Sequence, residues 1–446
     1  MDGYQEQLSS IYTHAFGNTD LLRKYGVPIG GDQLTRVRLS EAKNLRSLSV
    51  TSEKRYDNLH PIVCEMWHSK RDFLDKCFRK FFKAEVSPGT LNHFKTILHR
   101  TDVNGKVKGR FQPHFNLLMS VGEGMVIEQI YEFFKMEGND SQPQHKLCAD
   151  LSDVQPVEQS DVLMKIVHDF MTHYGYGTVD CPKNNLQPCS RTQRIVGISK
   201  SEDKRIVIRY EVSSSPNSET DEPYNYCMQL CHWYLHLAAL DDTAKEGDLN
   251  RTVVNCQYSL PFFYAHSKLS KYLVENIDYI LKCNYLLSPL QKMRVLEGSY
   301  VNTKGGKGKN VESDLTQENS VCNQKALIKS LVANKSEKSI KRVTGAADTI
   351  AVICSKFDAS VQIKAKSGHH SKPLDKTDQE LISKELRKSR PFHVTPGRKC
   401  PGFANICAVP VSVEQIPAMK QRLNQIITRL TRGLSVDVEN EDDVDV

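Results

Sequence analysis

The sequence contains no long hydrophobic run. None of its stretches approaches the ~18 consecutive apolar residues that a membrane-spanning helix needs, so we exclude an integral membrane protein. Met1 is followed by Asp2, Gln5 and Glu6 rather than by an apolar segment, so we expect no secretory signal peptide. These two absences predict an intracellular protein, with the nucleus left open as one location.

Cysteine is present but lacks the pattern of a disulfide scaffold. The 446 residues include 13 cysteines, an odd number without regular spacing, and disulfide-rich chains have a cysteine share above ~8%. The spacings of zinc-binding motifs are lacking as well. No internal repeat is found. What remains is a chain long enough to bury a substantial core.

The net charge is small, but it is unevenly distributed. The 60 Lys and Arg residues exceed the 53 Asp and Glu residues by 7. Residues 291–400 alone hold 22 basic and 11 acidic residues, whereas residues 437–446 hold six acidic residues and no basic one. The basic segment suits a polyanionic partner such as DNA, and we expect the acidic end to be a solvated tail.

Most of the hydrophobic periodicity is helical. In residues 64–83 the apolar side chains from Trp67 to Phe81 recur at three-, four- and seven-residue offsets, which gives one apolar stripe on a helix. A proline-capped helix start is predicted at Ser288 and Pro289. The other predicted helices cover residues 116–136, 161–174, 224–241, 248–266, 268–287, 313–332, 336–356, 376–389 and 415–432.

Strand signals are few. Residues 26–30 form a short apolar stub, and residues 194–199 and 205–212 alternate in a way that predicts a hairpin. We therefore predict a mainly α fold with a small β-sheet, in the α+β class. Shifts in composition divide the chain into an N-terminal segment at 1–25, an α-rich region at 26–138, a linker at 139–160, a helical region at 161–360, a basic C-terminal region at 361–433 and an acidic, disordered tail at 434–446.

Asp32 is the first candidate for chemistry. It lies in the motif Gly30–Thr35 (GGDQLT), where the strand-like stub ends, and carboxylates at strand ends are held rigidly at an edge open to a ligand. The alternative is that Asp32 caps the helix-like run that follows, a position at which Asp is favoured. Spacing alone favours the cap.

Cys64, Trp67 and His68 form the second candidate. At the start of the predicted helix 64–83, Cys64 and His68 are four residues apart and would share a helix face. They supply half of a zinc site at most, because zinc takes about four ligands. The alternative is structural support, with Cys64 and Trp67 in the core and His68 satisfying a buried polar group.

Residues 302–310 (NTKGGKGKN) form the third candidate. Three glycines free the backbone, and Lys304, Lys307 and Lys309 supply positive charge, a combination that can approach phosphate groups closely. The loop is not of the Walker type, because Asn310 stands where Ser or Thr is needed. A nucleic-acid backbone contact and a solvated turn both stay open. The further nucleic-acid-binding candidates in the basic segment are Lys341 and Arg342.

Asp314 and Glu318 form the fourth candidate. They are four residues apart at the start of the predicted helix 313–332, so both can lie on one helix face. A carboxylate pair on one face can contribute ligands to Mg²⁺. The alternative is that the acidic residues complement the helix dipole in the first turn. The two interpretations are comparable because the neighbouring loop is basic.

These motifs occur together in a recognisable order. Over about residues 26–360 the chain resembles the uncharacterised eukaryotic family catalogued as domain of unknown function 6589. The family has no established activity to carry over. The matching features are Gly31–Arg38, the apolar segment that ends in Trp67 and His68, Tyr224–Tyr226, Lys245–Asp248 (KEGD), Leu286–Pro289 and, most specific, Asn302–Leu315 followed by Glu318.

The resemblance implies a possible origin and chemistry. The multi-copy occurrence of the family suggests transposon ancestry, and the GGDQLT and Cys-x-x-Trp-His segments are similar to transposases with an RNase H-like core, which hold two divalent ions with three carboxylates. By this resemblance Asp32 would be the second catalytic acid and Glu318, with Asp314 nearby, the third. Asp32 and Glu318 would bind Mg²⁺, His68 would support them, and a partial RNase H-like core would lie within a large helical domain.

The chain departs from the family pattern in two places. The strand that would carry the first catalytic acid is missing before Asp32, and Asn319 follows Glu318 where relatives commonly have His. We therefore expect a fragment or an inactive, transposon-derived protein. Three functions stay open: a DNA-binding protein without nuclease activity, a metal-dependent phosphodiester-cleaving enzyme, and a helical scaffold. The oligomeric state is left open.

Overall fold

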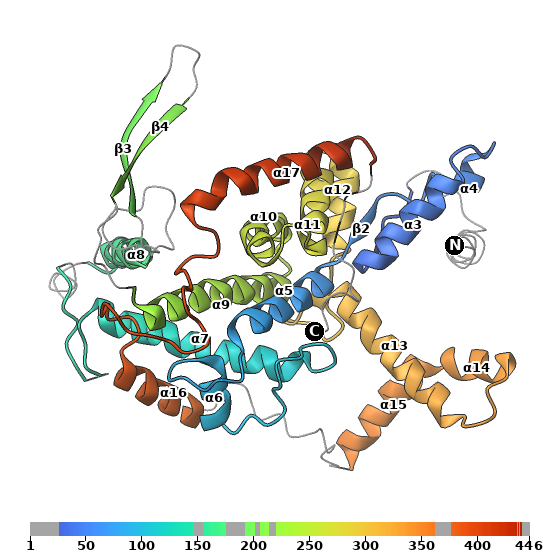
Figure 1. Cartoon of the computed structure of the whole chain (residues 1–446). Coiled ribbons are helices and arrows are strands. Elements are labelled where there is room, and N and C mark those ends of the chain that lie inside the picture. Colours follow the sequence, from blue (N-terminus) through green and yellow to red (C-terminus); the bar gives the residue numbers. More distant parts are fainter. Residues whose placement is uncertain are drawn as a thin grey trace. The chain divides into compact units, whose positions relative to one another are not determined.

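The chain divides into two compact units, each built from segments distant in the sequence. Figure 1 labels the helices and strands and colours them along the sequence. Unit 1 comprises Met1–Phe73, Ala239–His370 and Gln421–Val446, and unit 2 comprises Leu74–Ala238 and Ser371–Lys420. The computed structural model describes residues 26–138, 140–146, 155–174, 192–200, 206–213, 220–361, 376–434, 436 and 438. The predicted segment 1–25, the middle of the predicted linker and most of the acidic tail lie outside these residues, and the division into six segments stays a prediction.

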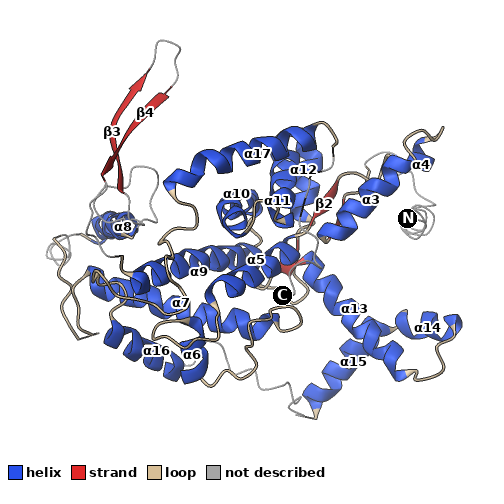
Figure 2. Ribbon diagram, in the orientation of Figure 1, coloured by secondary structure: helices blue, strands red, loops and turns tan. Residues whose placement is uncertain are grey.

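Helices dominate the secondary structure, and the strands are short apart from one hairpin (Figure 2). The predicted class, mainly α with little β-sheet, is confirmed. Among the described residues every sheet is a single pair of strands, so the partial RNase H-like core stays a prediction. In the same residues no helix combines the length and the apolar character that crossing a bilayer requires. Nine cysteines there are free thiols, and Cys407 is disulfide-bonded.

Unit 1 is built around a parallel pair of short strands. Their register runs from Ile29 opposite Ile62 to Gly31 opposite Cys64. Ile62 and Val63, which point to opposite faces of the strand, belong to two different hydrophobic clusters. Both faces are therefore covered. The elements of unit 1 up to the arm described below are β1 (Ile29–Gly31), α3 (Gln33–Leu45), α4 (Ser52–Arg55), β2 (Ile62–Cys64), α10 (Leu249–His266), α11 (Lys271–Leu281), the π-helical turn η2 (Lys282–Leu286), α12 (Pro289–Glu297), β5 (Tyr300–Val301) and β6 (Val311–Glu312).

Local sequence explains where several of these helices begin. Asp248 caps α10 by accepting from the backbone N–H groups of Asn250 and Arg251. Ser288 caps α12 in a capping box with Gln291, as the serine–proline pair predicts. Such caps satisfy the N–H groups of the first turn, which have no partner within the helix.

The part of unit 1 that follows β6 is a group of three helices, which we call the basic arm. It consists of α13 (Ser313–Ser330), α14 (Glu337–Thr344) and α15 (Ala347–Ser360). Both α14 and α15 pack on α13. The prediction of a single helix over 336–356 is wrong, because the chain forms two helices there. Helix α14 ends at Gly345, whose N–H donates to the carbonyl of Lys341. Glycine favours such an ending because it stabilises helix interiors poorly.

Unit 2 contains a helical core and an antiparallel hairpin. Its helix α7 (Phe111–Phe133) packs closely with α16 (Lys376–Ser389), since Gly124 of α7 leaves room for the side chain of Ile382. Backbone pairing of β3 with β4 confirms the predicted hairpin. Three helices have residues in both units: α5 (Met66–Phe81), α9 (Glu222–Glu246) and α17 (Ile416–Thr431). The other elements are α6 (Leu91–Ile97), α7 (Phe111–Phe133), α8 (Pro156–His173), β3 (Thr192–Lys200), β4 (Ile206–Ser213), α16 (Lys376–Ser389) and the 3₁₀ turn η3 (Val413–Gln415).

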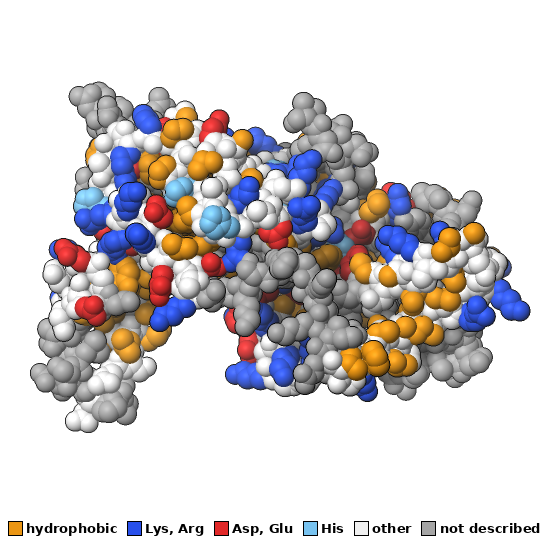
Figure 3. All heavy atoms as spheres, turned by 90° about the horizontal axis from the view of Figure 1, so that it is seen from below, with side chains coloured by type: hydrophobic (Ala, Val, Ile, Leu, Met, Phe, Trp, Pro, Cys, Tyr) orange, Lys and Arg blue, Asp and Glu red, His pale blue; other side chains and the backbone are white. Residues whose placement is uncertain are grey.

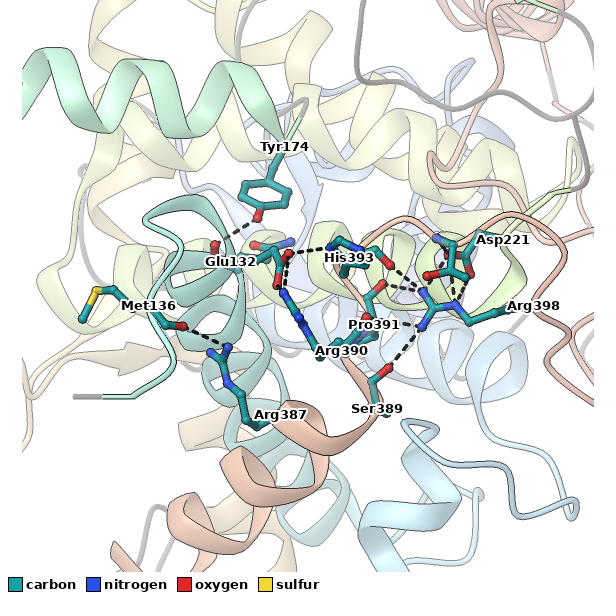
Figure 4. A network of polar contacts seen from close by, with 12 residues as sticks. Glu132, Met136, Tyr174, Asp221, Arg387, Ser389, Arg390, Pro391, His393 and Arg398 are labelled. Carbon is teal, nitrogen blue, oxygen red and sulfur yellow. Dashed lines mark hydrogen bonds and ion pairs between the residues drawn. The ribbon is translucent and has the colours of Figure 1, made fainter. Parts of the chain in front are cut away.

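Arginines that follow α16 and lie within it are bound to acidic residues of the same unit (Figure 4). Arg398 forms a 2.6 Å ion pair with the buried carboxylate of Asp221 and donates to several backbone carbonyls. Arg390 pairs with Glu132 at 3.0 Å, and Arg387 pairs with Glu128 at 2.9 Å. Three arginines in the C-terminal part of the predicted basic segment are thus neutralised by internal ion pairs.

Two further predictions need correction. Cys64 is the last residue of strand β2 rather than the first turn of a helix, so it does not share a helix face with His68. The helix predicted over 268–287 is α11 followed by the π-helical turn η2. The apolar stripe of the helix predicted over 64–83 is confirmed, since Phe78 and Phe81 of α5 are fully buried.

Candidate functional site

Strands β1 and β2 end side by side and place two acidic residues at one edge. Gly31 pairs with Cys64, so Asp32 and Glu65 follow at the same end of the sheet. Asp32 Oδ1 accepts a hydrogen bond of 2.7 Å from the N–H of Thr35 and caps α3. Within the described part of the chain no hydrogen bond or ion pair joins Asp32 to the other candidate residues. Its observed contact is that of a helix cap.

The two glycines of the GGDQLT motif leave room for neighbouring side chains. A Cβ atom at Gly30 would overlap the carboxylate of Glu65, and one at Gly31 would press on the side chain of Thr35. Any larger residue would have to displace these neighbours. The motif therefore brings the Glu65 carboxylate close to strand β1.

Asp314, from the first turn of α13, is bound to the start of α5. Its carboxylate accepts hydrogen bonds from the backbone N–H groups of Trp67 at 3.2 Å and His68 at 3.0 Å, and contacts His68 Nδ1 at 2.9 Å. Asp314 is buried. A negative charge at a helix N-terminus satisfies unpartnered N–H groups and complements the helix dipole. Asp314 thus acts as a cap supplied by a residue about 250 positions away.

His68 lies between the two carboxylates that the sequence placed on one helix face. Its Nδ1 faces Asp314, and its Nε2 lies 3.5 Å from Glu318 Oε1. The ring is buried, whereas the Glu318 side chain is 42% exposed. The structure thus brings Asp314, Glu318 and His68 together, with Trp67 packed edge-on against the His68 ring.

Glu65 belongs to the same cluster, although sequence reasoning did not include it. Burial, and after it the Asp314 carboxylate, raise the pKa of Glu65 to about 7, although His68 opposes the shift. The signal that could have found Glu65 is the run Pro61–Cys64, a buried strand whose end is equivalent to that of the GGD motif. Burial also raises the pKa of the Cys64 thiol, and both Asp314 and Asp32 add to that effect.

Two buried groups of ion pairs connect the elements that carry the cluster of Glu65, His68, Asp314 and Glu318. Lys70 of α5 pairs with Asp241 at 3.1 Å and with Glu312, the residue that precedes α13. Arg36 of α3 forms a two-pronged pair with Glu275 of α11, with one contact of 2.6 Å. Buried charges must be paired, because removing one partner leaves an uncompensated charge. These contacts fix the positions of α3, α5 and α13 relative to the strands.

The Gly/Lys loop, residues 302–310, is attached to the turn that contains the KEGD motif. Asn310 donates from Nδ2 to the carbonyl of Lys245 at 2.9 Å. Gly247 has a positive φ of 67° and permits this approach, because a Cβ there would crowd the Asn310 amide. The side chains of all three loop lysines are exposed, and Lys307 has one distant contact, 3.9 Å from Glu246.

The middle of the basic arm carries most of its positive charge without compensation. Residues 319–347 hold six basic residues and one acidic residue, Glu337, which pairs with Lys341 at 2.7 Å. Figure 3 shows Lys and Arg side chains at the edge of this part, beside apolar side chains. Within residues 319–347, all of which the structure describes, five exposed basic residues make no ion pair: Lys325, Lys329, Lys335, Lys338 and Arg342.

The predicted nucleic-acid contacts form two groups rather than one. Lys304, Lys307 and Lys309 precede α13, whereas Lys341 and Arg342 lie on α14 after it. Helix α13 has 18 residues and is therefore ~27 Å long.

The motif segments thus occur in the order expected for the family that the sequence resembles, and several of them are in contact in the folded chain. The GGDQLT strand ends beside Glu65, Trp67 and His68 contact Asp314, and the KEGD turn holds the Gly/Lys loop. The chain belongs to the family of unknown function DUF6589. The family model matches residues 2–370. No curated protein and no solved structure matches the chain. The DUF6589 match includes the whole candidate site and the basic arm, whereas α16 and α17 follow it.

The carboxylates of this DUF6589 chain do not fit a divalent metal pair as they are arranged. Both oxygens of Asp314 are engaged by α5, and Asp32 is engaged by Thr35. Among the described residues no group of three or more His, Cys, Asp or Glu side chains is placed to hold a metal ion. We therefore derive no Mg²⁺-dependent step, and the catalytic roles of Asp32, Asp314 and Glu318 stay a prediction.

Proposed function

We propose that this DUF6589 chain binds nucleic acid through phosphate contacts made by the basic arm and the Gly/Lys loop, without cleaving it. The observation that carries the proposal is the uncompensated charge of residues 319–347 on exposed helices. Exposed Lys and Arg side chains bind the phosphate backbone by displacing its counterions. DNA is the partner we favour, and the transposon-derived origin implied by the sequence resemblance is part of the same proposal.

The Gly/Lys loop supports the proposal as a second contact. Three of its glycines adopt positive φ angles, of 68°, 87° and 70°, so the backbone turns tightly and presents the lysines outward. Because the loop and α14 lie at opposite ends of α13, one duplex could be contacted at both ends of the arm. Such contacts position a protein on nucleic acid without reading its sequence.

The absence of cleavage in this proposal follows from what the carboxylates contact. A phosphodiester-cleaving site of the two-metal type needs carboxylates that are free to bridge ions ~4 Å apart. Here Asp314 and Asp32 cap helices. Four of the five Lys and Arg residues of 387–399 are paired with acidic residues of unit 2, namely Arg387, Arg390, Arg398 and Lys399, so this segment does not favour a third contact.

The test is a fluorescence-anisotropy titration of labelled duplex DNA with the whole chain. We expect binding at ~50 mM salt and a logarithm of the affinity that falls linearly with the logarithm of the salt concentration, by ~0.9 per phosphate contact. A variant with alanine at four lysines of the arm should bind more weakly and with a shallower slope: Lys325, Lys329, Lys335 and Lys338.

A chain that is only a scaffold gives a different result. It would show no saturable binding at ~50 mM salt, where the phosphate contribution is strong, and that result would overturn the proposal. Incubation of the same DNA with Mg²⁺ tests the second part, because cleavage by the wild type that is lost on Asp314→Asn would contradict a role without catalysis.

A further inference from the structure

A pocket of about 330 Å³ opens beside the ends of β1 and β2. This volume lies within the ~300–1,000 Å³ range of small-molecule sites. The walls are formed by both strands, by α11 and by the last turn of α12, all in unit 1. Val63, Tyr279 and Val295 are buried and give the pocket an apolar lining. Neither the nucleic-acid proposal nor the helix caps use this space.

One carboxylate faces the pocket without a partner. Glu65 lines it together with Gly30, and the Glu65 carboxylate occupies the space that a Cβ of Gly30 would fill. Among the described residues no hydrogen bond or ion pair engages this carboxylate. A partly buried carboxylate gains stability from a hydrogen-bond donor, and most of all from a charged one.

The electrostatic surroundings of the pocket favour a cation. Glu297 adds a second carboxylate at the rim, where α12 ends, and the carbonyl end of a helix attracts positive charge. Asp314 lies close enough to raise the pKa of Glu65. Arg294 is the one basic residue of the lining, and it makes interactions of its own, so the lining has a net negative charge.

We propose that this pocket binds a small planar or alkyl cation with N–H donors, an amidinium, guanidinium or ammonium group, and that Glu65 is its counter-ion. The apolar wall would contact the organic part of the ligand, while the carboxylate would accept its N–H groups. An amidinium or guanidinium presents two parallel N–H donors, which match the two oxygens of a carboxylate. The ligand class is therefore defined by charge and by donor geometry.

Two probes of equal shape and different charge test the proposal. Benzamidinium is a planar cation with a hydrocarbon ring, and benzamide is its neutral counterpart. In isothermal titration calorimetry with the whole wild-type chain, we expect saturable binding of benzamidinium and at least about tenfold weaker binding of benzamide, the size of a hydrogen bond to a charged group. Equal binding of the two, or no saturation by benzamidinium up to about 10 mM, would overturn the proposal.

Two matched variants locate the counter-ion. Glu65→Gln keeps the size of the side chain and should reduce benzamidinium affinity at least about tenfold, to the level of benzamide. Glu41→Gln removes an exposed charge of α3 that does not line the pocket and should change the affinity less than about threefold, because exposed charges contribute little. Unchanged affinity in Glu65→Gln would refute the assignment. If that variant fails to fold, the comparison of the two probes on the wild type still decides.

Discussion

Asp314 accepts hydrogen bonds from two successive backbone N–H groups of α5 and contacts a histidine ring of the same helix. Replacing it with Asn removes the charge and turns one acceptor into a donor that faces N–H groups. We expect Asp314→Asn to lower the free energy of unfolding by about 1–3 kcal/mol. Urea denaturation followed by circular dichroism measures this loss.

Glu318 provides the matched control for Asp314, because it lies one turn further along α13 and is more exposed. Glu318→Gln should change the free energy of unfolding by no more than about 0.5 kcal/mol. Equal stability of Asp314→Asn and the wild type would show that the carboxylate is not a structural cap, and it would revive the interpretation of Asp314 as a metal ligand.

Glu65 should make unit 1 less stable as the pH rises. Its folded pKa of about 7 lies above the ordinary value of 4.5, so the folded chain binds more protons between these values and the free energy of unfolding falls as pH increases through this window. Since one pKa unit corresponds to ~1.4 kcal/mol, the loss is on the order of 1–3 kcal/mol. Glu128 and Glu275, whose pKa values burial also raises to about 7, give the same trend.

Comparison with Glu65→Gln isolates the contribution of Glu65, since the other two carboxyl groups are unchanged in that variant. The glutamine resembles the protonated acid, so the variant should match the wild type at about pH 5 and exceed its stability at about pH 8. Urea denaturation at both pH values measures the difference. Identical pH dependence in the two proteins would mean that Glu65 is ionised in the fold at a normal pKa.

Sequence reasoning reached part of this cluster. The four-residue spacing of Asp314 and Glu318 predicted that both lie on one helix face, and the family resemblance associated His68 with them; the structure brings the three together. The helix-cap alternative for Asp32 matches its observed hydrogen bond. Glu65 was missed because its strand has three residues, too few to show alternation, and both faces are buried. The pairing of Asp314 with α5 joins residues about 250 positions apart, and nothing in local sequence encodes such a contact.

At the scale of elements, helix positions were more predictable than helix ends. The helices predicted at 376–389 and 415–432 coincide with α16 and α17 within one residue, because their polar and apolar residues alternate with a clear helical period. The breaks at Gly345 and after Leu281 were missed. Hydrophobic periodicity continues across both breaks in the sequence, so it does not reveal them, although Gly345 is a residue type that favours a helix end.

The attachment of the Gly/Lys loop depends on Gly247. Its φ of 67° is unfavourable for other residues, and a Cβ there would crowd the Asn310 amide that binds the Lys245 carbonyl. We expect Gly247→Ala to cost about 1–2 kcal/mol from backbone strain and to release the loop. Limited trypsin digestion should therefore cleave after the loop lysines several times faster than in the wild type.

Gly109→Ala is the control for strain alone. Gly109 has a φ of 79°, and no atom lies within 4 Å of the Cβ that would be added. This variant should lose similar stability but show no faster cleavage in the loop. Equal digestion of the loop in both variants would mean that Gly247 does not anchor it.

For the proposed binding of nucleic acid by the whole molecule, the positions of the basic residues matter more than the net charge. The basic segment 291–400 is divided by the fold, since the arginines of its last part bind acidic residues in unit 2. Four lysines of the arm, by contrast, are exposed and make no ion pair among the described residues: Lys325, Lys329, Lys335 and Lys338. Composition could not distinguish these two groups, because the acidic partners at 128, 132 and 221 are far away in the sequence. The net charge of +7 therefore says little about where a polyanion would bind.

Two variants with the same net charge distinguish the effect of where the lysines lie from the effect of the net charge. Each replaces four exposed lysines with alanine and lowers the formal charge from +7 to +3. The arm variant should lose most DNA affinity and reduce the salt slope by up to ~0.9 for each contact removed, whereas a variant in unit 2 should keep nearly the wild-type affinity and slope. Equal losses in both would show that binding follows the overall charge and not the arm. The control positions in unit 2 are Lys106, Lys135, Lys165 and Lys384.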